Sequence, residues 1–115
     1  MTIGQNDVMD KVEQMVCSCV NVVMRLSERE EVDCEEVYDG KKNIPTGRAM
    51  ARNFIFDVLH NRYGFSFSVI AQRGDCNRES VMRCVRKCHD LVLYDKSYGK
   101  VNEMINDKLR EWYGE

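Results

Sequence analysis

The sequence predicts an all-α protein, a single domain of five or six helices. Apolar residues recur every three or four positions along most of the 115-residue chain, which is the period of an amphipathic helix. No stretch alternates apolar and polar residues convincingly enough for a half-buried strand. Capping residues and turns separate the periodic stretches. A chain of this length can bury one core without disulfides or metal ions.

The first helix is expected over residues 8–26, with Asn6 or Asp7 capping its start. Its apolar residues share helical spacing: Val8, Val12, Met15, Val16, Cys19, Val23 and Leu26. The methionines of this segment fit a core better than a partner-binding groove, because Met readily fills irregular gaps in a core.

An acidic stretch, SEREEVDCEEVYDG, follows and predicts a short second helix. Two capping boxes fit it, Ser27 with Glu30 or Asp33 with Glu36, and Gly40 is expected to end it. Its charges are most simply a solvated surface. They can also repel phosphate and so limit nonspecific DNA binding, or dock a basic partner protein.

The middle of the chain predicts a basic linker, KKNIPTG, and then a long helix from about Thr46 to Arg62. Met50, Phe54, Val58 and Leu59 fall on one face of that helix. A short helix with Phe67, Ile70 and Ala71 is expected next, capped by Ser66.

The last third predicts two further helices. Gly74 and Asp75 form a turn, and Asn77 is expected to cap a helix over residues 78–93. A final helix spans about residues 98–113. The domain thus divides into acidic N-terminal helices (6–40), a basic middle (41–93) and a C-terminal helix (97–113).

The charges are segregated along the chain. Residues 1–40 hold three basic and ten acidic side chains, residues 41–88 hold ten and three, and residues 89–115 hold four and six. The net charge of −2 therefore conceals a middle segment of +7 between acidic flanks. A basic patch is the electrostatic footprint of nucleic-acid binding. The alternative is that these charges only solvate exposed helix faces.

The helix over residues 78–93 has two distinct faces. At about 100° per residue, the apolar face gathers Val81, Cys84, Val85, Cys88 and Val92. The opposite face gathers Glu79, Arg83, Arg86 and Asp90, with Ser80, Met82 and Lys87 on its flanks. A short helix, a turn and a second helix with a basic outer face form a helix-turn-helix arrangement. The second helix of such a unit fits the major groove of DNA.

Residues 48–87 resemble the C-terminal DNA-binding domain of the bacterial replication initiator DnaA, a helix-turn-helix fold of the Trp-repressor-like class. GRAMARNF is similar to the Arg-x-(Met/Ile)-Ala start of that family's long helix. FSFSVIA is similar to its Ser-Leu-x-x-Ile-Gly helix, and GDCNRESVMRCVRK stands where the family has Gly-Arg-Asp-His-Thr-Thr-Val. With the upstream helix and the linker included, the resemblance covers about residues 8–113. The family's helix-start arginine matches Arg48 or Arg52, depending on the register.

The resemblance implies binding to double-stranded DNA, with a role in replication or transcriptional control. The residues expected at base edges are Arg78, Glu79, Ser80 and Arg83. The residues expected at phosphates are Lys41, Lys42, Arg48, Arg52, Arg86 and Lys87. Arg78 and Glu79 replace the family's histidine and threonine, so a sequence preference other than the DnaA box is expected. The alternative function is a helical protein-interaction module that kept the fold and lost DNA binding.

Several other functions are not expected. The sequence has no Gly-x-x-x-x-Gly-Lys-(Ser/Thr) phosphate loop, so the ATPase module of DnaA is missing. His60 and His89 belong to no evident catalytic unit, so we expect no enzyme and no cofactor. The pairs Cys17 with Cys19 and Cys84 with Cys88 fit buried thiols better than a metal site. No apolar run could span a membrane and no export signal is evident, so we expect a cytoplasmic protein with reduced thiols.

Overall fold

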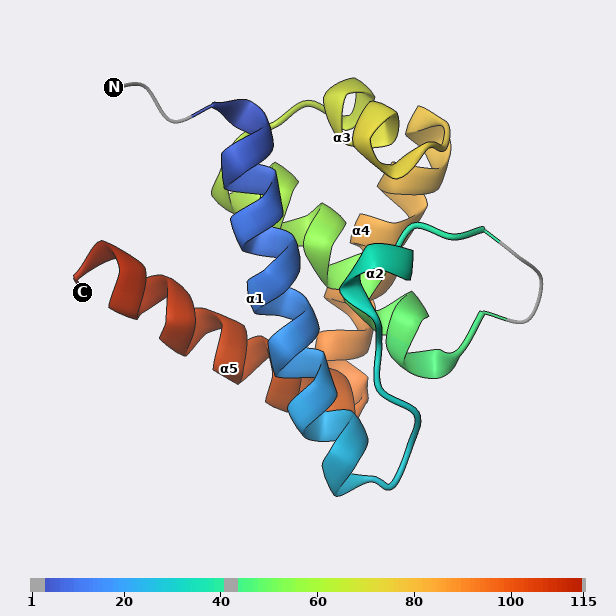
Figure 1. Ribbon diagram of the computed structural model, residues 1–115, viewed down its shortest axis with the longest axis vertical. Helices are drawn as coiled ribbons and strands as arrows, with labels where there is room; N and C mark the ends of the chain where they lie inside the picture. The colour runs from blue at the N-terminus through green and yellow to red at the C-terminus, as the bar shows by residue number, and fades with distance from the viewer. Residues whose placement is uncertain (1–3, 41–43, 115) are drawn as a thin grey trace.

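The computed structural model describes residues 4–40 and 44–114 (Figure 1). Within these ranges the protein consists of helices joined by turns and loops and has no strand, which confirms the predicted fold class. The α-helices are α1 (Gln5–Leu26), α2 (Thr46–Asp57), α3 (Phe67–Gly74), α4 (Arg78–Tyr94) and α5 (Lys96–Tyr113). A 3-10 turn, η1 (Cys34–Glu36), precedes α2, and a π-helical turn, η2 (Val58–Arg62), continues it. None of the helices within these ranges combines the length and apolar character needed to cross a bilayer.

The five helices share one hydrophobic core, and α2 lies at its centre (Figure 1). α2 packs most extensively against α4 and α1, and α5 closes the core by packing on both α1 and α4. Each helix contributes at least one almost fully buried side chain, including Val16, Phe54, Ile70, Val81 and Ile105. Burial of such side chains is the main force that holds a small helical domain together.

α1 begins earlier than expected. Gly4 precedes its first residue, and the Gly4 carbonyl accepts a hydrogen bond from the Val8 amide at 3.2 Å. Asn6 and Asp7 lie inside the first turn, and no side chain caps the helix, so the predicted cap is wrong. A carboxylate in the first turn already interacts favourably with the helix dipole, which gives Asp7 a stabilising place within the helix.

The acidic segment forms only the three-residue turn η1, not the expected helix. The Asp33 side chain caps this turn by accepting from the Glu35 amide at 3.0 Å, whereas Ser27 instead ends α1. On a continuous helix, the carboxylates of this stretch would lie three and four residues apart and repel one another. The segment is held instead by Asn21, whose side chain accepts from the Val32 amide at 2.6 Å and donates to its carbonyl at 2.9 Å.

The helix expected from Thr46 to Arg62 has the predicted extent, but its last five residues form the π-helical turn η2. The wider turn is visible in the hydrogen bond from the Tyr63 amide to the Val58 carbonyl, five residues back, at 3.3 Å. α5 begins two residues before its expected start because Asp95 caps it, accepting from the Tyr98 amide at 3.1 Å. Asp95 is also the single residue that joins α4 to α5.

Candidate nucleic-acid interface

α3 and α4 are joined by a three-residue turn whose hydrogen bonds follow from the sequence. Ser66 caps α3 by accepting from the Val69 amide at 3.2 Å, and Asn77 caps α4 by accepting from the Ser80 amide at 2.8 Å. Asp75, between them, adopts a left-handed conformation with φ of +51°. Aspartate is among the few residues that tolerate this conformation. Both predicted caps are confirmed. The predicted turn is confirmed at Asp75, whereas Gly74, expected in the same turn, is the last residue of α3.

Gly74 brings α3 into close contact with α2. A Cβ atom at this position would lie 2.9 Å from Phe56 Cζ, whose ring is almost completely buried. A side chain at position 74 would therefore push α3 away from the core. The glycine fixes the distance between the two helices and hence the position of the turn that leads into α4.

α4 presents the two faces that its sequence predicts. Val81 and Cys88 are buried in the core, and Cys84, Val85 and Val92 are half-buried against it. The charged residues predicted to contact DNA are all exposed: Arg78, Glu79, Arg83, Arg86 and Lys87. Ser80 is half-buried, because it lies on the flank of α4 that faces α2.

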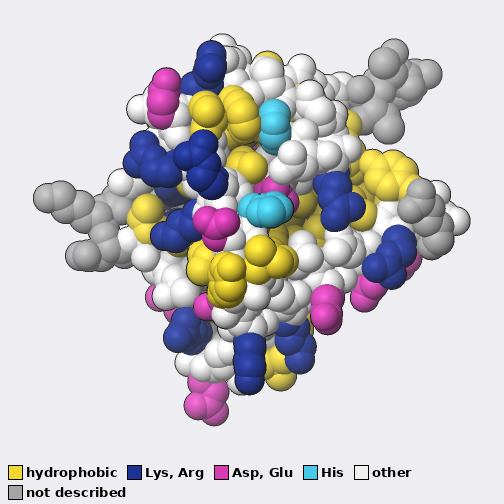
Figure 2. Space-filling model, turned by 180° about the vertical axis from the view of Figure 1, so that it is seen from behind, with side chains coloured by type: hydrophobic (Ala, Val, Ile, Leu, Met, Phe, Trp, Pro, Cys, Tyr) yellow, Lys and Arg dark blue, Asp and Glu magenta, His cyan; other side chains and the backbone are white. Residues whose placement is uncertain are grey.

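The exposed cations of α4 have no ion-pair partners within the described ranges. Arg78, Arg83, Arg86 and Lys87 take part in no salt bridge or side-chain hydrogen bond there. By contrast, five other cations in the same ranges are paired with carboxylates: Arg25, Arg48, Arg73, Lys108 and Arg110. Glu79 and Arg83, four residues apart, do not pair either. Figure 2 shows Lys and Arg side chains gathered at the upper left of the back face, on the side of the molecule where α4 lies. Within the described ranges, ion pairs thus neutralise none of these four cations.

Two of these cations line a groove between α2 and α4. The groove has a volume of about 290 Å³. Among the residues that the structure describes, its basic residues are Arg52 from α2 and Arg83 and Lys87 from α4, and its lining includes no carboxylate. The structure therefore joins residues that the sequence assigned to different tasks, with Arg83 expected at a base and Arg52 and Lys87 at phosphates.

Arg48 and Arg52 both reach the segment that contains η1. Arg48 forms an ion pair with Glu36 at 3.4 Å and its side chain is only 16% exposed. The Arg52 guanidinium donates to the carbonyl oxygens of Val37, at 3.4 Å, and Asp39, at 2.8 Å. The sequence places both arginines on one helix face, one turn apart, and both use that face to hold the acidic segment. Lys41 and Lys42, expected at phosphates, lie outside the described residues.

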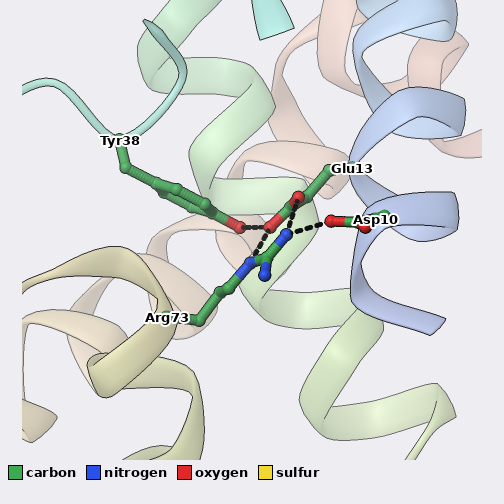
Figure 3. A network of polar contacts seen from close by, with 4 residues as sticks. All are labelled: Asp10, Glu13, Tyr38 and Arg73. Atoms are coloured by element: carbon green, nitrogen blue, oxygen red, sulfur yellow. Dashed lines mark hydrogen bonds and ion pairs between the residues drawn. The ribbon is translucent and has the colours of Figure 1, made fainter. Parts of the chain in front are cut away.

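A buried ion pair connects α3 to α1, and sequence reasoning missed it (Figure 3). Arg73 donates to both carboxylate oxygens of Glu13, at 2.8 and 2.7 Å, and also contacts Asp10. Glu13 is 6% exposed and also accepts from the Tyr38 hydroxyl. The hydrogen bond to Glu13 is the largest cause that raises the pKa of Arg73, and burial raises the pKa of Tyr38. The sequence feature that could have indicated it is Glu13, a carboxylate four residues from both Met9 and Cys17 on the apolar side of α1.

The cysteines are free thiols, and three of them, Cys17, Cys19 and Cys88, are buried. Burial raises the pKa of the Cys88 thiol and keeps it protonated at neutral pH. Over the described ranges, no group of three or more His, Cys, Asp or Glu side chains is arranged to hold a metal ion. The predicted role of Cys88 on the core face of α4 is confirmed by its burial.

Comparisons with known proteins identify no relative of this chain. No family model, curated protein or solved structure matches the chain. The class that the fold itself defines is a five-helix, all-α domain with an exposed basic helix.

Proposed function

We propose that this protein binds duplex DNA and that α4 is the helix that enters the major groove. The observation that carries the proposal is a set of four exposed cations on α4, none of them in an ion pair with a described residue, in a protein of net charge −2. Isolated cations on a surface ordinarily gain from a nearby carboxylate, so four on one helix favour an anionic partner. Arginine donates two hydrogen bonds to guanine or to phosphate, and lysine supplies a point charge.

The geometry around α4 supports a helix-turn-helix reading. α3, the turn at residues 75–77 and α4 follow one another directly, and α4 presents its N-terminal residues, Arg78 and Glu79, to solvent. In helix-turn-helix proteins the N-terminal residues of the second helix contact base edges. We propose on this basis, and on the resemblance to the DnaA C-terminal domain, that the protein acts in replication or transcriptional control.

The DNA site is proposed to differ from the DnaA box. The start of α4 carries Arg78, Glu79 and Ser80, where that family has histidine and two threonines. Arginine suits guanine, and glutamate can accept from the amino group of cytosine. A site that contains G·C pairs is therefore the proposed target.

Electrophoretic mobility shift with a random-sequence duplex at low salt tests the proposal directly. We expect binding by the wild type and a loss of affinity when Arg78 and Arg86, which lie on the exposed side of α4, are both replaced by Gln. The matched control is Arg25→Gln with Lys108→Gln, which removes the same charge from α1 and α5. Equal loss in the two double variants, or no binding by the wild type, would contradict the proposal.

The second candidate is a helical protein-interaction module. The observation that favours it is Glu79, an exposed carboxylate without a partner in the described ranges, at the very position where DNA phosphates would approach. An acidic side chain is repelled by phosphate unless it faces a base edge. Under this alternative, the acidic segment around η1 would contact a basic protein, and the wild type would not shift duplex DNA at any salt concentration.

A further inference from the structure

We propose that the groove between α2 and α4 is a binding site for one phosphate group. It deepens the proposed function, because DNA is one source of that phosphate. The pocket itself does not depend on DNA binding, since a free phosphorylated ligand presents the same chemistry. The structural basis is a set of cationic and polar side chains that two helices bring to one hollow.

The described lining of the groove carries positive charge only. Arg52, Arg83 and Lys87 line it, and no carboxylate stands among the lining residues that the structure describes. Arg83 and Lys87 are four residues apart on α4, so their side chains project from the same side of that helix. Arg52 approaches from α2 on the opposite wall. Three cations around one hollow, with no carboxylate in its described lining, favour an anion of high charge density.

The polar groups of the groove complement a phosphate. Ser80 and Asn53 line it together with the cations, and a hydroxyl and an amide both donate hydrogen bonds to phosphate oxygens. Asn53 is 5% exposed, and its amide nitrogen donates to the Tyr98 hydroxyl at 3.0 Å, which fixes the side chain in place. The remaining lining side chains are apolar or a thiol.

One of the cations is held in position before any ligand arrives. Arg52 donates through Nε and Nη2 to the carbonyl oxygens of Val37 and Asp39. A guanidinium has five N–H donors, so these two bonds leave donors for a ligand. A side chain that is already ordered loses less conformational entropy on binding. The volume of about 290 Å³ lies at the lower end of ligand sites and suits a small group.

The first experiment titrates the protein with inorganic phosphate and with adenosine 5′-monophosphate, followed by amide chemical shifts. We expect saturable shifts at Ser80, Arg83 and Lys87. Replacing Arg83 and Lys87 together by Gln should weaken binding about tenfold or more, because two charge-assisted hydrogen bonds are lost. The matched control, Arg78→Gln with Arg86→Gln, removes the same charge from α4 outside the groove and should leave the phosphate affinity nearly unchanged.

Ser80→Ala provides a second variant that leaves every charge in place. It should weaken phosphate binding by a smaller factor than the loss of the two cations. Glutamine and alanine both favour helix, so circular dichroism should show α4 intact in all variants. Equal weakening of phosphate binding in the two double variants would mean that phosphate is attracted by the overall charge of α4, and this result would contradict the proposed pocket. Failure of the wild type to bind either probe at low salt would overturn it as well.

The second experiment identifies the source of the phosphate. Duplexes that carry one neutral methylphosphonate at successive positions are titrated with the wild type and with the Arg83→Gln, Lys87→Gln variant. If DNA fills the pocket, one position should weaken wild-type binding and have no effect in the variant. If duplex binding is absent while inorganic phosphate still binds in the groove, the proposed function fails. The pocket then stands as a site for a free phosphorylated ligand.

Discussion

Arg73 in α3 and Glu13 in α1 are 60 positions apart in the chain, and their side chains form a two-bond ion pair (Figure 3). The pair is the main polar link between α1 and the helix that precedes α4. It is largely shielded, with side-chain exposures of 26% for Arg73 and 9% for Glu13. Because Arg73 lies in α3, the ion pair helps to fix the position of α3 against α1. The position of the turn that leads into α4 follows from that of α3.

Glu13→Gln should therefore destabilise the protein. The change leaves the Arg73 guanidinium without the buried carboxylate that accepts two of its hydrogen bonds, and loss of one partner of a shielded pair costs about 3 kcal/mol. Urea denaturation measures this as a decrease in the free energy of unfolding. Asp10→Asn is the matched control, because Asp10 contacts the same guanidinium from a 61% exposed position. An exposed pair of this kind is worth roughly 0–1 kcal/mol. A similar decrease in the free energy of unfolding in both variants would show that the burial of Glu13 does not strengthen its ion pair.

Gly74→Ala should also destabilise the protein, by about 1–3 kcal/mol, because the new methyl group would overlap the Phe56 ring in a filled core. The ring lies 2.9 Å from the position of the added Cβ. Gly99→Ala in α5 is the control, since its Cβ would meet nothing closer than the Val92 carbonyl oxygen at 3.6 Å. In a helix that change should stabilise by roughly 0.5–1 kcal/mol. Thermal denaturation of the two variants should shift in opposite directions, and a stable Gly74→Ala protein would contradict the close contact of α3 with α2.

Binding to DNA should weaken steeply with salt. With about 4 to 7 phosphate contacts, counterion release predicts a slope near −4 to −6 in a plot of log K against log salt concentration. Titrations by fluorescence anisotropy at several potassium chloride concentrations measure this slope. Arg86→Ala should reduce its magnitude by about one unit, since one phosphate contact is removed. A slope near zero for the wild type would contradict electrostatic binding.

Glu79 should determine part of the sequence preference. Because Glu79 does not pair with Arg83 in the structure, two roles remain for it at a DNA surface. If it accepts from a cytosine amino group, selection from a random duplex library should enrich a G·C-containing site, and Glu79→Ala should lose the preference at one base pair. If α4 does not enter the groove, Glu79→Ala should only strengthen nonspecific binding. Enrichment of the ordinary DnaA box by the wild type would show that the substitutions at the start of α4 do not change the site.

Thiol reactivity should follow burial. Cys76, in the turn before α4, is the one exposed thiol among the six, whereas Cys17, Cys19 and Cys88 are buried. Iodoacetamide labelling followed by mass spectrometry should modify Cys76 first and the three buried thiols only after unfolding. The reaction at Cys76 should be slower than that of an unperturbed cysteine, because partial desolvation raises its pKa and lowers the thiolate fraction. Cys76→Ser should remove the first modification. Rapid labelling of Cys88 would contradict its place in the core.

The sequence alone determined the features that depend on residues within about one helical turn. The caps at Ser66 and Asn77, the turn at Asp75 and the buried face of α4 could be predicted because they follow from local hydrogen bonds and from the helical period. The predicted cap of α1 and the predicted acidic helix were wrong for a related reason. A helix can start one turn earlier at little cost, and a short charged segment forms a helix only if repulsion between its carboxylates is offset.

Only the tertiary structure decided which distant side chains meet. Helical periodicity assigns a residue to a face of its own helix, but the partner of that face depends on how the helices pack. For this reason the sequence predicted separate DNA contacts for Arg52, Arg83 and Lys87. The packing of α2 on α4 brings these three residues to one groove. The pairing of Glu13 with Arg73 was hidden in the same way. A carboxylate tolerates burial only beside a compensating cation, and the cation that compensates Glu13 comes from α3, where helix packing places it.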